Sequence, residues 1–120
     1  MAAKDDLGRA GEARAADHLT GNGYRVVDRN WRCSEGELDL VVVRDRELVA
    51  VEVKTRRGDG FGDPLEAVDE RKRHRLWRLA QRWRREHPDA AADRRLRVDV
   101  IGITGPDPHC GRLVHVEDIR

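Results

Sequence analysis

The sequence predicts an α/β domain in which helices cover one mixed β-sheet. Two segments, 6–20 and 69–87, have apolar residues at helical spacing, and segments rich in β-forming residues lie between and after them. An order of helix, three-strand meander, crossover helix and one or two further strands is typical of a single sheet with helices packed on it. The length of 120 residues fits one compact domain, which we expect to span 1–120.

The N-terminal half is expected to form a helix followed by a meander of three strands. The helix spans about 6–20 because apolar residues recur there at every third position, and Gly21 and Gly23 end it. The strands are expected at residues 24–31, 36–43 and 48–55. Only the polar residues Arg44-Asp45-Arg46-Glu47 separate the last two strands, so these should form an antiparallel hairpin.

The C-terminal half begins with a loop at 57–64, which contains three glycines and a proline. The helix at 69–87 has a suitable capping residue in Asp69 and stops before Pro88. A polar stretch then leads to the last elements, which are a strand at 96–103, a turn at 105–108 and an edge strand that 113–119 can add.

Acidic residues occupy positions of the predicted hairpin that should face one another. Side chains alternate between the two faces of a strand, so Glu52 and Lys54 share one face of their strand. A connection of two or four residues places Asp39 opposite Glu52 and Glu37 opposite Lys54. Opposed carboxylates destabilise each other unless a proton or a cation lies between them.

A divalent cation is the simplest way to stabilise such a pair. Mg²⁺ takes oxygen ligands and keeps several waters, so one or two carboxylates and a substrate phosphate complete its coordination. Lys54 would lie beside the metal, where an amine can orient or deprotonate a bound water or balance the charge of a phosphate. An arginine could only balance charge because it keeps its proton, and the chain contains 21 Arg and 3 Lys.

The same residues are also compatible with a solvated sheet face on which Lys54 bridges Glu37. The connection lacks the Asn-Gly or Gly signal of a tight hairpin, and a bulge there would displace the acidic pair. A second Glu-x-Lys sequence occurs at Glu70-Arg71-Lys72. That copy falls in a predicted helix, where residues two apart do not face each other, so we do not expect it to build the same cluster.

The second predicted helix is strongly basic. Between 71 and 85 there is no acid, and the cations are Arg71, Lys72, Arg73, Arg75, Arg78, Arg82, Arg84 and Arg85. Such a helix can contact phosphates non-specifically, with an affinity that falls as salt rises. A solvated amphipathic helix in an arginine-rich chain explains the pattern equally well. Trp77 and Trp83 are interpreted as core residues rather than as base-stacking platforms.

Composition argues against several other classes of protein. The charge is balanced, with 24 Lys and Arg against 23 Asp and Glu, which is unlike a disordered chain. We find neither an apolar run of membrane length nor a signal-peptide pattern, and expect a cytoplasmic protein without membrane contact. Cys33 and Cys110 are expected to be reduced thiols, because they lie far apart and outside any CxxC pattern. The five histidines have no metal-ligand spacing and are expected at the surface, and Ser34 lacks a nucleophile motif.

A set of short motifs follows in order from about residue 7 to 103. The motifs are Gly8-Arg9-Ala10-Gly11-Glu12, Asn30-Trp31-Arg32, Gly36-Glu37-Leu38-Asp39-Leu40, Val51-Glu52-Val53-Lys54-Thr55-Arg56, Phe61-Gly62-Asp63-Pro64, Ala67-Val68 with Lys72, and Arg97-Val98-Asp99-Val100. Together they resemble the YraN-like family of small bacterial proteins. The resemblance implies a restriction-endonuclease-like fold of the PD-(D/E)xK nuclease superfamily, with an αβββαβ core, related in outline to archaeal Holliday-junction resolvases. Leu38 departs from the pattern, since it stands where the superfamily's name implies proline.

The resemblance also implies roles for individual residues. Asp39 and Glu52 match metal ligands, Lys54 matches the catalytic lysine, and Glu12 matches an acidic residue that often joins the metal cluster. The implied activity is Mg²⁺- or Mn²⁺-dependent endonuclease hydrolysis of phosphodiester bonds in DNA, in particular branched or structured DNA. The residues expected to bind nucleic acid are Arg56, Arg57, Lys72, Arg75, Arg78 and Arg82. The alternative is a nucleic-acid-binding or protein-interaction module that keeps the fold without hydrolysis, and the oligomeric state, a homodimer included, is left open.

Overall fold

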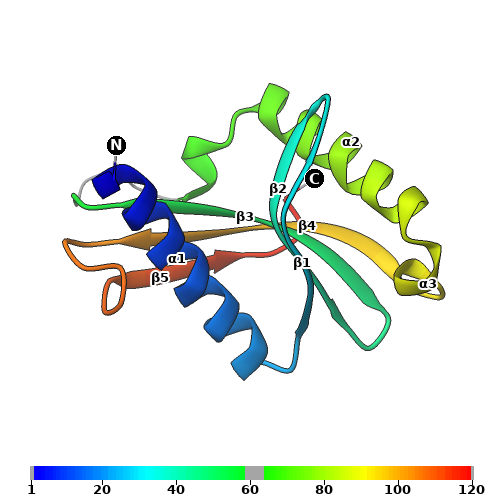
Figure 1. Cartoon of the computed structure of the whole chain (residues 1–120), viewed down its shortest axis with the longest axis horizontal. Coiled ribbons are helices and arrows are strands. Elements are labelled where there is room, and N and C mark those ends of the chain that lie inside the picture. Colours follow the sequence, from blue (N-terminus) through cyan, green and yellow to red (C-terminus); the bar gives the residue numbers. More distant parts are fainter. Residues whose placement is uncertain (1, 59–63, 120) are drawn as a thin grey trace.

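The computed structural model of the chain describes residues 2–58 and 64–119, and it has helices on both sides of one β-sheet (Figure 1). In chain order the elements are α1 (Ala2–Gly21), β1 (Arg25–Cys33), β2 (Gly36–Arg44), β3 (Glu47–Arg56), the 3-10 helix η1 (Pro64–Ala67), α2 (Glu70–Glu86), α3 (Pro88–Ala91), β4 (Arg95–Thr104) and β5 (Arg112–Val116). Every predicted helix and strand is present. Most of the predicted loop at 57–64, including Phe61 to Asp63 of one motif, lies outside the described residues.

The five strands form one mixed sheet in the order β1-β2-β3-β4-β5. β3 and β4 are parallel, and every other neighbouring pair is antiparallel. A parallel pair needs a crossover connection, and α2 lies in the segment that provides it. The predicted α/β class and αβββαβ order are confirmed, and the arrangement is consistent with a restriction-endonuclease-like fold.

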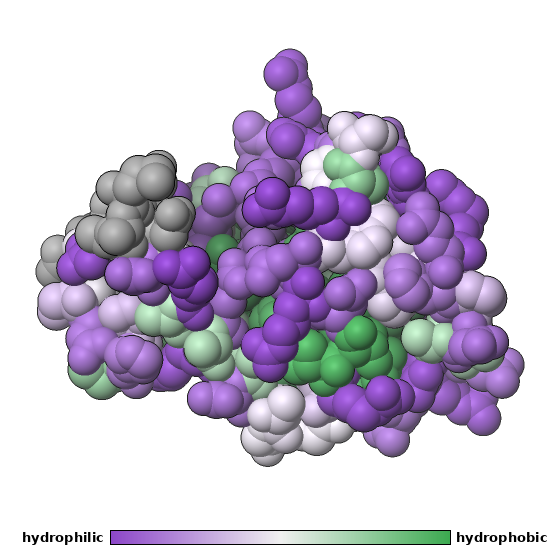
Figure 2. All heavy atoms as spheres, viewed as in Figure 1, coloured by the Kyte–Doolittle hydropathy of each residue, from purple (hydrophilic) through white to green (hydrophobic). Residues whose placement is uncertain are grey.

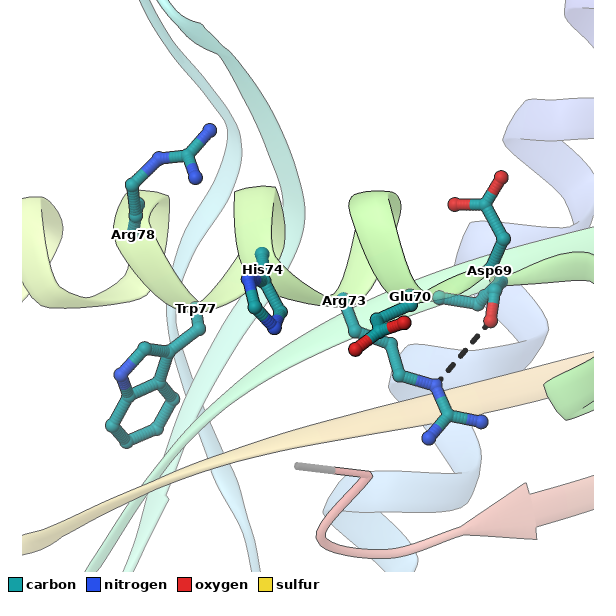
Figure 3. Close-up of a pocket in the computed structure, with 7 residues that line it drawn as sticks. Asp69, Glu70, Arg73, His74, Trp77 and Arg78 are labelled. Carbon is teal, nitrogen blue, oxygen red and sulfur yellow. Dashed lines mark hydrogen bonds between the residues drawn. The ribbon is translucent and has the colours of Figure 1, made fainter.

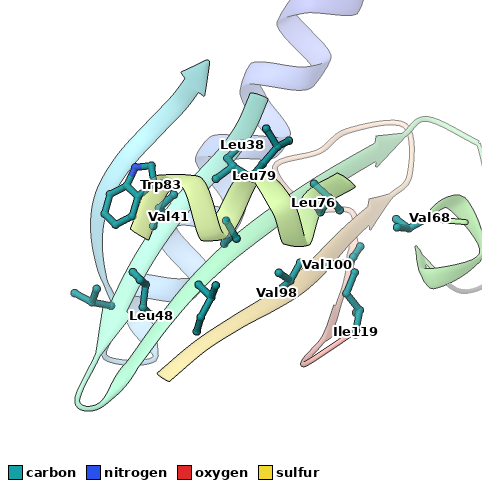
Figure 4. Close-up of a cluster of buried hydrophobic side chains, with 14 residues drawn as sticks. Leu38, Val41, Leu48, Val68, Leu76, Leu79, Trp83, Val98, Val100 and Ile119 are labelled. Atoms are coloured by element: carbon teal, nitrogen blue, oxygen red, sulfur yellow. The ribbon is translucent and has the colours of Figure 1, made fainter. Parts of the chain in front are cut away.

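The two faces of the sheet are covered by different helices. The residues of α2 that are buried against one face are Leu76, Leu79, Ala80 and Trp83, and Figure 4 shows them packed with side chains from β2, β3 and β4. The residues of α1 that are buried against the other face are Ala15, Ala16 and Leu19. Because Leu48 and Ala50 of β3 belong to the core beneath α2, alternation directs Glu52 and Lys54 toward α2 as well.

The hairpin of β2 and β3 has the predicted register over five residue pairs, from Arg44–Glu47 to Leu40–Val51. The connection is a two-residue turn, and Asp45 takes the positive φ of 51° that such a turn requires. The pairing ends one position before Asp39 and Glu52, so the prediction of a ladder pair there is wrong. Asp39 instead accepts a hydrogen bond of 2.8 Å from the backbone N–H of Val53 through its side chain. Beyond this point β2 pairs only with β1, and the two strands leave the rest of the sheet (Figure 1).

A buried polar network joins α1, β4 and β5. Asp99 is fully buried, accepts hydrogen bonds of 2.9 and 3.0 Å from Arg97, and lies 2.8 Å from Nε2 of His115. The other ring nitrogen of His115 lies 3.2 Å from Nε2 of His18. The expectation that all five histidines lie at the surface is therefore wrong for His115, whose side chain is only 13% exposed. Its burial depends on the pairing of β5 with β4, which the histidine spacing in the sequence does not reveal.

Hydrophilic residues cover most of the face shown in Figure 2, and the apolar residues that remain visible gather beside β1. Within 2–58 and 64–119, no helix combines the length and apolar character that a membrane crossing requires. Cys33 and Cys110 are free thiols, as predicted.

Candidate active site

A cavity of about 390 Å³ opens where β2 leaves β3, on the side of the sheet that α2 covers. It brings together Asp39, Glu52 and Lys54, which the sequence predicts as catalytic, with Lys72 and Arg75, which it predicts as nucleic-acid ligands. The other lining residues are Gly36, Glu37, Val53, Leu76 and Leu79. The site therefore has a charged wall from β2, β3 and α2 and an apolar wall from α2.

The two carboxylates of the site destabilise each other's charge. Glu52 is only 8% exposed, and Asp39 is largely enclosed. Burial, together with the charge of Glu52, raises the pKa of Asp39 from 3.8 to about 7, against the hydrogen bond from Val53, which lowers it. Although the two residues are not a ladder pair, the charge of Glu52 still disfavours the charged form of Asp39.

Glu52 is contacted by two lysines from different elements. Nζ of Lys72 on α2 lies 2.7 Å from Oε2 of Glu52, and Nζ of Lys54 on β3 lies 3.6 Å from the same oxygen. The expectation that the second Glu-x-Lys sequence does not build a cluster of its own is consistent with this geometry, but the sequence did not predict the contact of Lys72 with Glu52. Glu70 and Lys72 do not form a second cluster; the crossover helix instead directs Lys72 into the first. Glu37, the alternative partner of Lys54, pairs with Arg32 at 3.1 Å.

The two lysines differ in how readily they lose a proton. The hydrogen bond with Lys72, together with burial, lowers the pKa of the Lys54 ammonium. Burial also disfavours the charge of Lys72, but its hydrogen bonds with Glu52 and Lys54 outweigh burial and raise its pKa. Lys54 therefore loses its proton more readily than Lys72 does.

Glu12 approaches the site from α1 because this helix lies unusually close to β3. A Cβ atom at Gly11 would overlap the side chain of Thr55, so glycine is what permits the contact. Burial raises the pKa of Glu12, with further contributions from Glu37 and Glu52 and an opposing hydrogen bond from Asn30. In the described parts of the chain, no three His, Cys, Asp or Glu side chains converge closely enough to hold a metal ion. The carboxylate pair is therefore the centre of the site, and Glu12 lies next to it.

Comparison with known proteins assigns the family. The model of "Uncharacterised protein family UPF0102" matches residues 11–103, a range that contains all the carboxylates and lysines of the site. This chain belongs to the UPF0102 family. It is 52% identical over 106 residues to a UPF0102 protein of Clavibacter michiganensis, covering 88% of each chain. It is 50% identical over 116 residues to one of Frankia casuarinae, covering 97% of each chain, and 46% identical over 118 residues to one of Mycobacterium tuberculosis, covering 94% of this chain and 91% of the relative. The YraN-like family that the motifs indicate is confirmed.

The remaining predicted nucleic-acid ligands of this UPF0102 protein lie around the cavity rather than in it. Arg56 and Arg57 are exposed at the end of β3, just after Lys54. Arg82 contacts Glu35 at 3.4 Å and Glu86 at 3.0 Å, and so joins α2 to the tip of the β1–β2 hairpin. Arg78 is exposed and lines a different cavity. Of the six predicted nucleic-acid ligands, only Lys72 and Arg75 therefore line the cavity itself.

The residues at the centre of this UPF0102 site fit a hard divalent cation. Two neighbouring carboxylates, of which Glu52 raises the pKa of Asp39, are a suitable oxygen donor set for Mg²⁺, which keeps waters in its remaining positions. Neither imidazole nor thiol lines the cavity, so the donor set does not favour zinc. With a cation between the carboxylates, both would ionise, and the amine of Lys54 would lie beside them.

Proposed function

We propose that this UPF0102 protein is a metal-dependent nuclease that hydrolyses phosphodiester bonds in DNA. The observation that carries the proposal is the enclosed pair of Asp39 and Glu52 beside two lysines of unequal proton affinity, in a cavity open to solvent. Phosphodiester hydrolysis needs charge stabilisation at the phosphate and a proton acceptor for water, and these residues supply both.

Each residue of the cavity has a distinct role in this mechanism. Asp39 and Glu52 would hold Mg²⁺ or Mn²⁺, with Glu12 as an additional acidic group beside them. The bound ion would lower the pKa of a water molecule and place a positive charge near the phosphate. Lys54, with its lowered pKa, orients the attacking water and accepts its proton. Lys72 stays protonated and balances the negative charge that develops on the phosphate.

The basic residues around the opening would hold the DNA backbone. Arg56 and Arg57 lie at the end of β3, and Arg75 lies in the cavity wall. Contacts of arginine with phosphate are independent of sequence and weaken as salt rises. We therefore expect recognition of DNA shape, with branched or structured DNA as the substrate, rather than recognition of a base sequence.

Cleavage assays test the proposal. The substrates are a four-way junction, a flap and single-stranded DNA, each with Mg²⁺ or Mn²⁺. Asp39→Asn and Lys54→Ala should each lower the rate by about 100-fold or more, which is the range typical for a general base or a charge-stabilising group. Glu37→Gln is the matched control, because this carboxylate lines the same cavity but is exposed and pairs with Arg32. Wild-type rates in both site variants would refute the mechanism.

One observation favours the non-catalytic alternative. The ammonium of Lys72 already lies 2.7 Å from Glu52, so a lysine partly neutralises this carboxylate without a metal. A module that only binds nucleic acid or a protein would retain its function in Asp39→Asn and lose it when the arginines of α2 are neutralised. Calorimetric titration with Mn²⁺ separates the two functions. A nuclease binds the ion in the wild type and not in Asp39→Asn, whereas a binding module shows no heat in either protein.

A further inference from the structure

A second cavity, of about 730 Å³, lies on the other flank of α2 from the candidate active site. Its lining residues are Val68, Asp69, Glu70, Arg73, His74, Trp77 and Arg78. Figure 3 shows Arg73, His74 and Trp77 projecting from the same side of α2, with Arg78 projecting from another side. We call this space the Trp77 cavity.

Trp77 is placed differently from the other tryptophan of α2. Trp83 is 2% exposed, and its indole N–H donates a hydrogen bond of 2.8 Å to Asp28, as expected for a core residue. Trp77 is only partly buried, packs at the edge of the core, and presents its ring to the cavity. The interpretation of Trp77 as a core residue is therefore only partly correct. An aromatic ring at the wall of an open cavity is a surface on which a planar group can stack.

The charges around the Trp77 cavity favour an uncharged polar ligand. Arg73 and Arg78 are balanced by Asp69 and Glu70, so the formal charge of the lining is zero with neutral His74. A phosphate would be repelled by two carboxylates there, so the arginines would add little net binding free energy. A nucleobase is flat and uncharged, and its edge carries both hydrogen-bond donors and acceptors, which the mixed lining can satisfy.

A row of arginines runs along the side of α2 that lies between the two cavities. Arg71, Arg75, Arg78, Arg82 and Arg85 follow one another at spacings of four and three residues, which places them on one face of the helix. At one edge of this face Arg75 lines the active-site cavity, and at the other Arg78 lines the Trp77 cavity. A nucleic-acid backbone that crosses α2 from one cavity to the other would therefore pass Arg75 and Arg78, with the other arginines of the row on either side.

We propose that the Trp77 cavity binds an unpaired base of the DNA, stacked on Trp77, while the arginine row holds the backbone that joins this base to the scissile phosphate. The inference rests on the proposed nuclease function and specifies its substrate. Bases of an intact duplex are paired and stacked, so they do not reach such a cavity. The substrate is thus DNA with a single-stranded segment next to the site of cleavage.

A binding experiment with matched DNAs tests this inference without relying on catalysis. Fluorescence anisotropy is measured for a duplex with a single-stranded thymidine tail and for the same duplex with an abasic tail, which keeps the phosphates and removes the bases. We expect the wild type to prefer the base-bearing tail by about 10-fold, the range for one stacked base. Trp77→Leu should bind both tails equally, and Trp77→Tyr should restore most of the preference. Trp31→Leu is the control, because Trp31 is also partly buried but lies on β1.

The outcomes separate this inference from the proposed function. If Trp77→Leu melts like the wild type and still prefers the base-bearing tail, the Trp77 cavity is not a base site. If Trp77→Leu instead converts a dimer to a monomer in sedimentation and leaves the preference intact, the cavity contacts a second copy of the chain and the inference is overturned. If the wild type prefers the base-bearing tail but cleaves no DNA, the Trp77 cavity is supported and the nuclease proposal fails.

Discussion

The buried carboxylate of Glu52 is stabilised by an ion pair with Lys72. It is nearly buried, and its closest cation is Lys72 of α2 rather than Lys54 of its own strand. Removing one partner of an enclosed ion pair leaves the other charge poorly solvated. We predict that Lys72→Ala lowers the free energy of unfolding by about 1 to 3 kcal/mol in urea. Arg71→Ala, an exposed neighbour, should change it by less than about 0.5 kcal/mol, and an equal loss in both variants would contradict the role of the pair.

Asp39 is expected to destabilise the metal-free protein at neutral pH. Its pKa rises from 3.8 to about 7 on folding, so the folded state binds more protons than the unfolded state between these values, and stability falls as pH rises through this interval. At pH 8, Asp39→Asn should therefore unfold at a higher temperature than the wild type, and its free energy of unfolding should be larger by up to about 4 kcal/mol. Below about pH 4 this difference in stability should disappear. Thermal melts in EDTA at pH 8 and below pH 4 measure the difference in stability between the two proteins. Saturating Mn²⁺ should raise the melting temperature of the wild type and not that of Asp39→Asn.

The acidic pair and Lys54 could be predicted because strand alternation is a local rule. The contact of Lys72 with Glu52 could not, because it depends on how the crossover helix packs on the sheet, which periodicity does not specify. A compositional signal was nevertheless present, since only 3 of the 24 basic residues are lysines and two of them lie at this site.

At the scale of elements, the position of α1 depends on one glycine. Gly11 allows the helix to contact Thr55 of β3, and this contact brings Glu12 beside the carboxylate pair. Gly11→Ala should destabilise the fold by about 1 to 3 kcal/mol, because the added methyl overlaps Thr55. Under the proposed nuclease function, it should also lower the rate of DNA cleavage by moving Glu12.

Gly8 provides the matched control for this prediction. It lies in the same helix, but nothing approaches within 4 Å of a Cβ placed there. Gly8→Ala should therefore stabilise the protein by about 0.5 to 1 kcal/mol, as alanine does in an open helix interior. Chemical denaturation of both variants gives the comparison, and a stabilising Gly11→Ala would show that α1 does not need this close approach.

The order of the elements could be predicted because helical and strand periodicities alternate clearly along the chain. Two short helices could not. η1 has four residues, which are too few for periodicity to show. Pro88 predicts the end of α2 from the sequence alone, but in the structure it is also the first residue of α3. The register of β2 and β3 followed from the short connection, but the point where β2 leaves β3 did not. That separation opens the cavity of the candidate active site, so the feature on which the candidate site depends is one that local rules leave undetermined.

At the scale of the whole molecule, the polar network of Asp99 ties together elements that are far apart in the sequence. His115 of β5 contacts Asp99 of β4 and His18 of α1, and Arg97 also donates to Tyr24 at 2.7 Å. Burial, the neighbouring His115 and the charge of Arg14 lower the pKa of His18 below 6.5. The unfolded state then binds more protons than the folded state just below pH 6.5, so stability is complete above this pH and declines as the pH falls.

His18 and Asp39 give the stability opposite dependences on pH, and both act just below pH 6.5, so the two effects partly cancel there in the wild type. Asp39→Asn removes the decrease in stability with rising pH that Asp39 causes. The increase in stability with rising pH that His18 causes should then become measurable. Adding His18→Gln to Asp39→Asn should flatten the profile again, whereas adding His74→Gln, an exposed histidine on α2, should leave it unchanged. Urea unfolding of the three proteins at half-unit pH intervals measures these slopes. A profile of Asp39→Asn that stays flat from pH 5 to 6.5 would mean that protonation of His18 does not disturb the network.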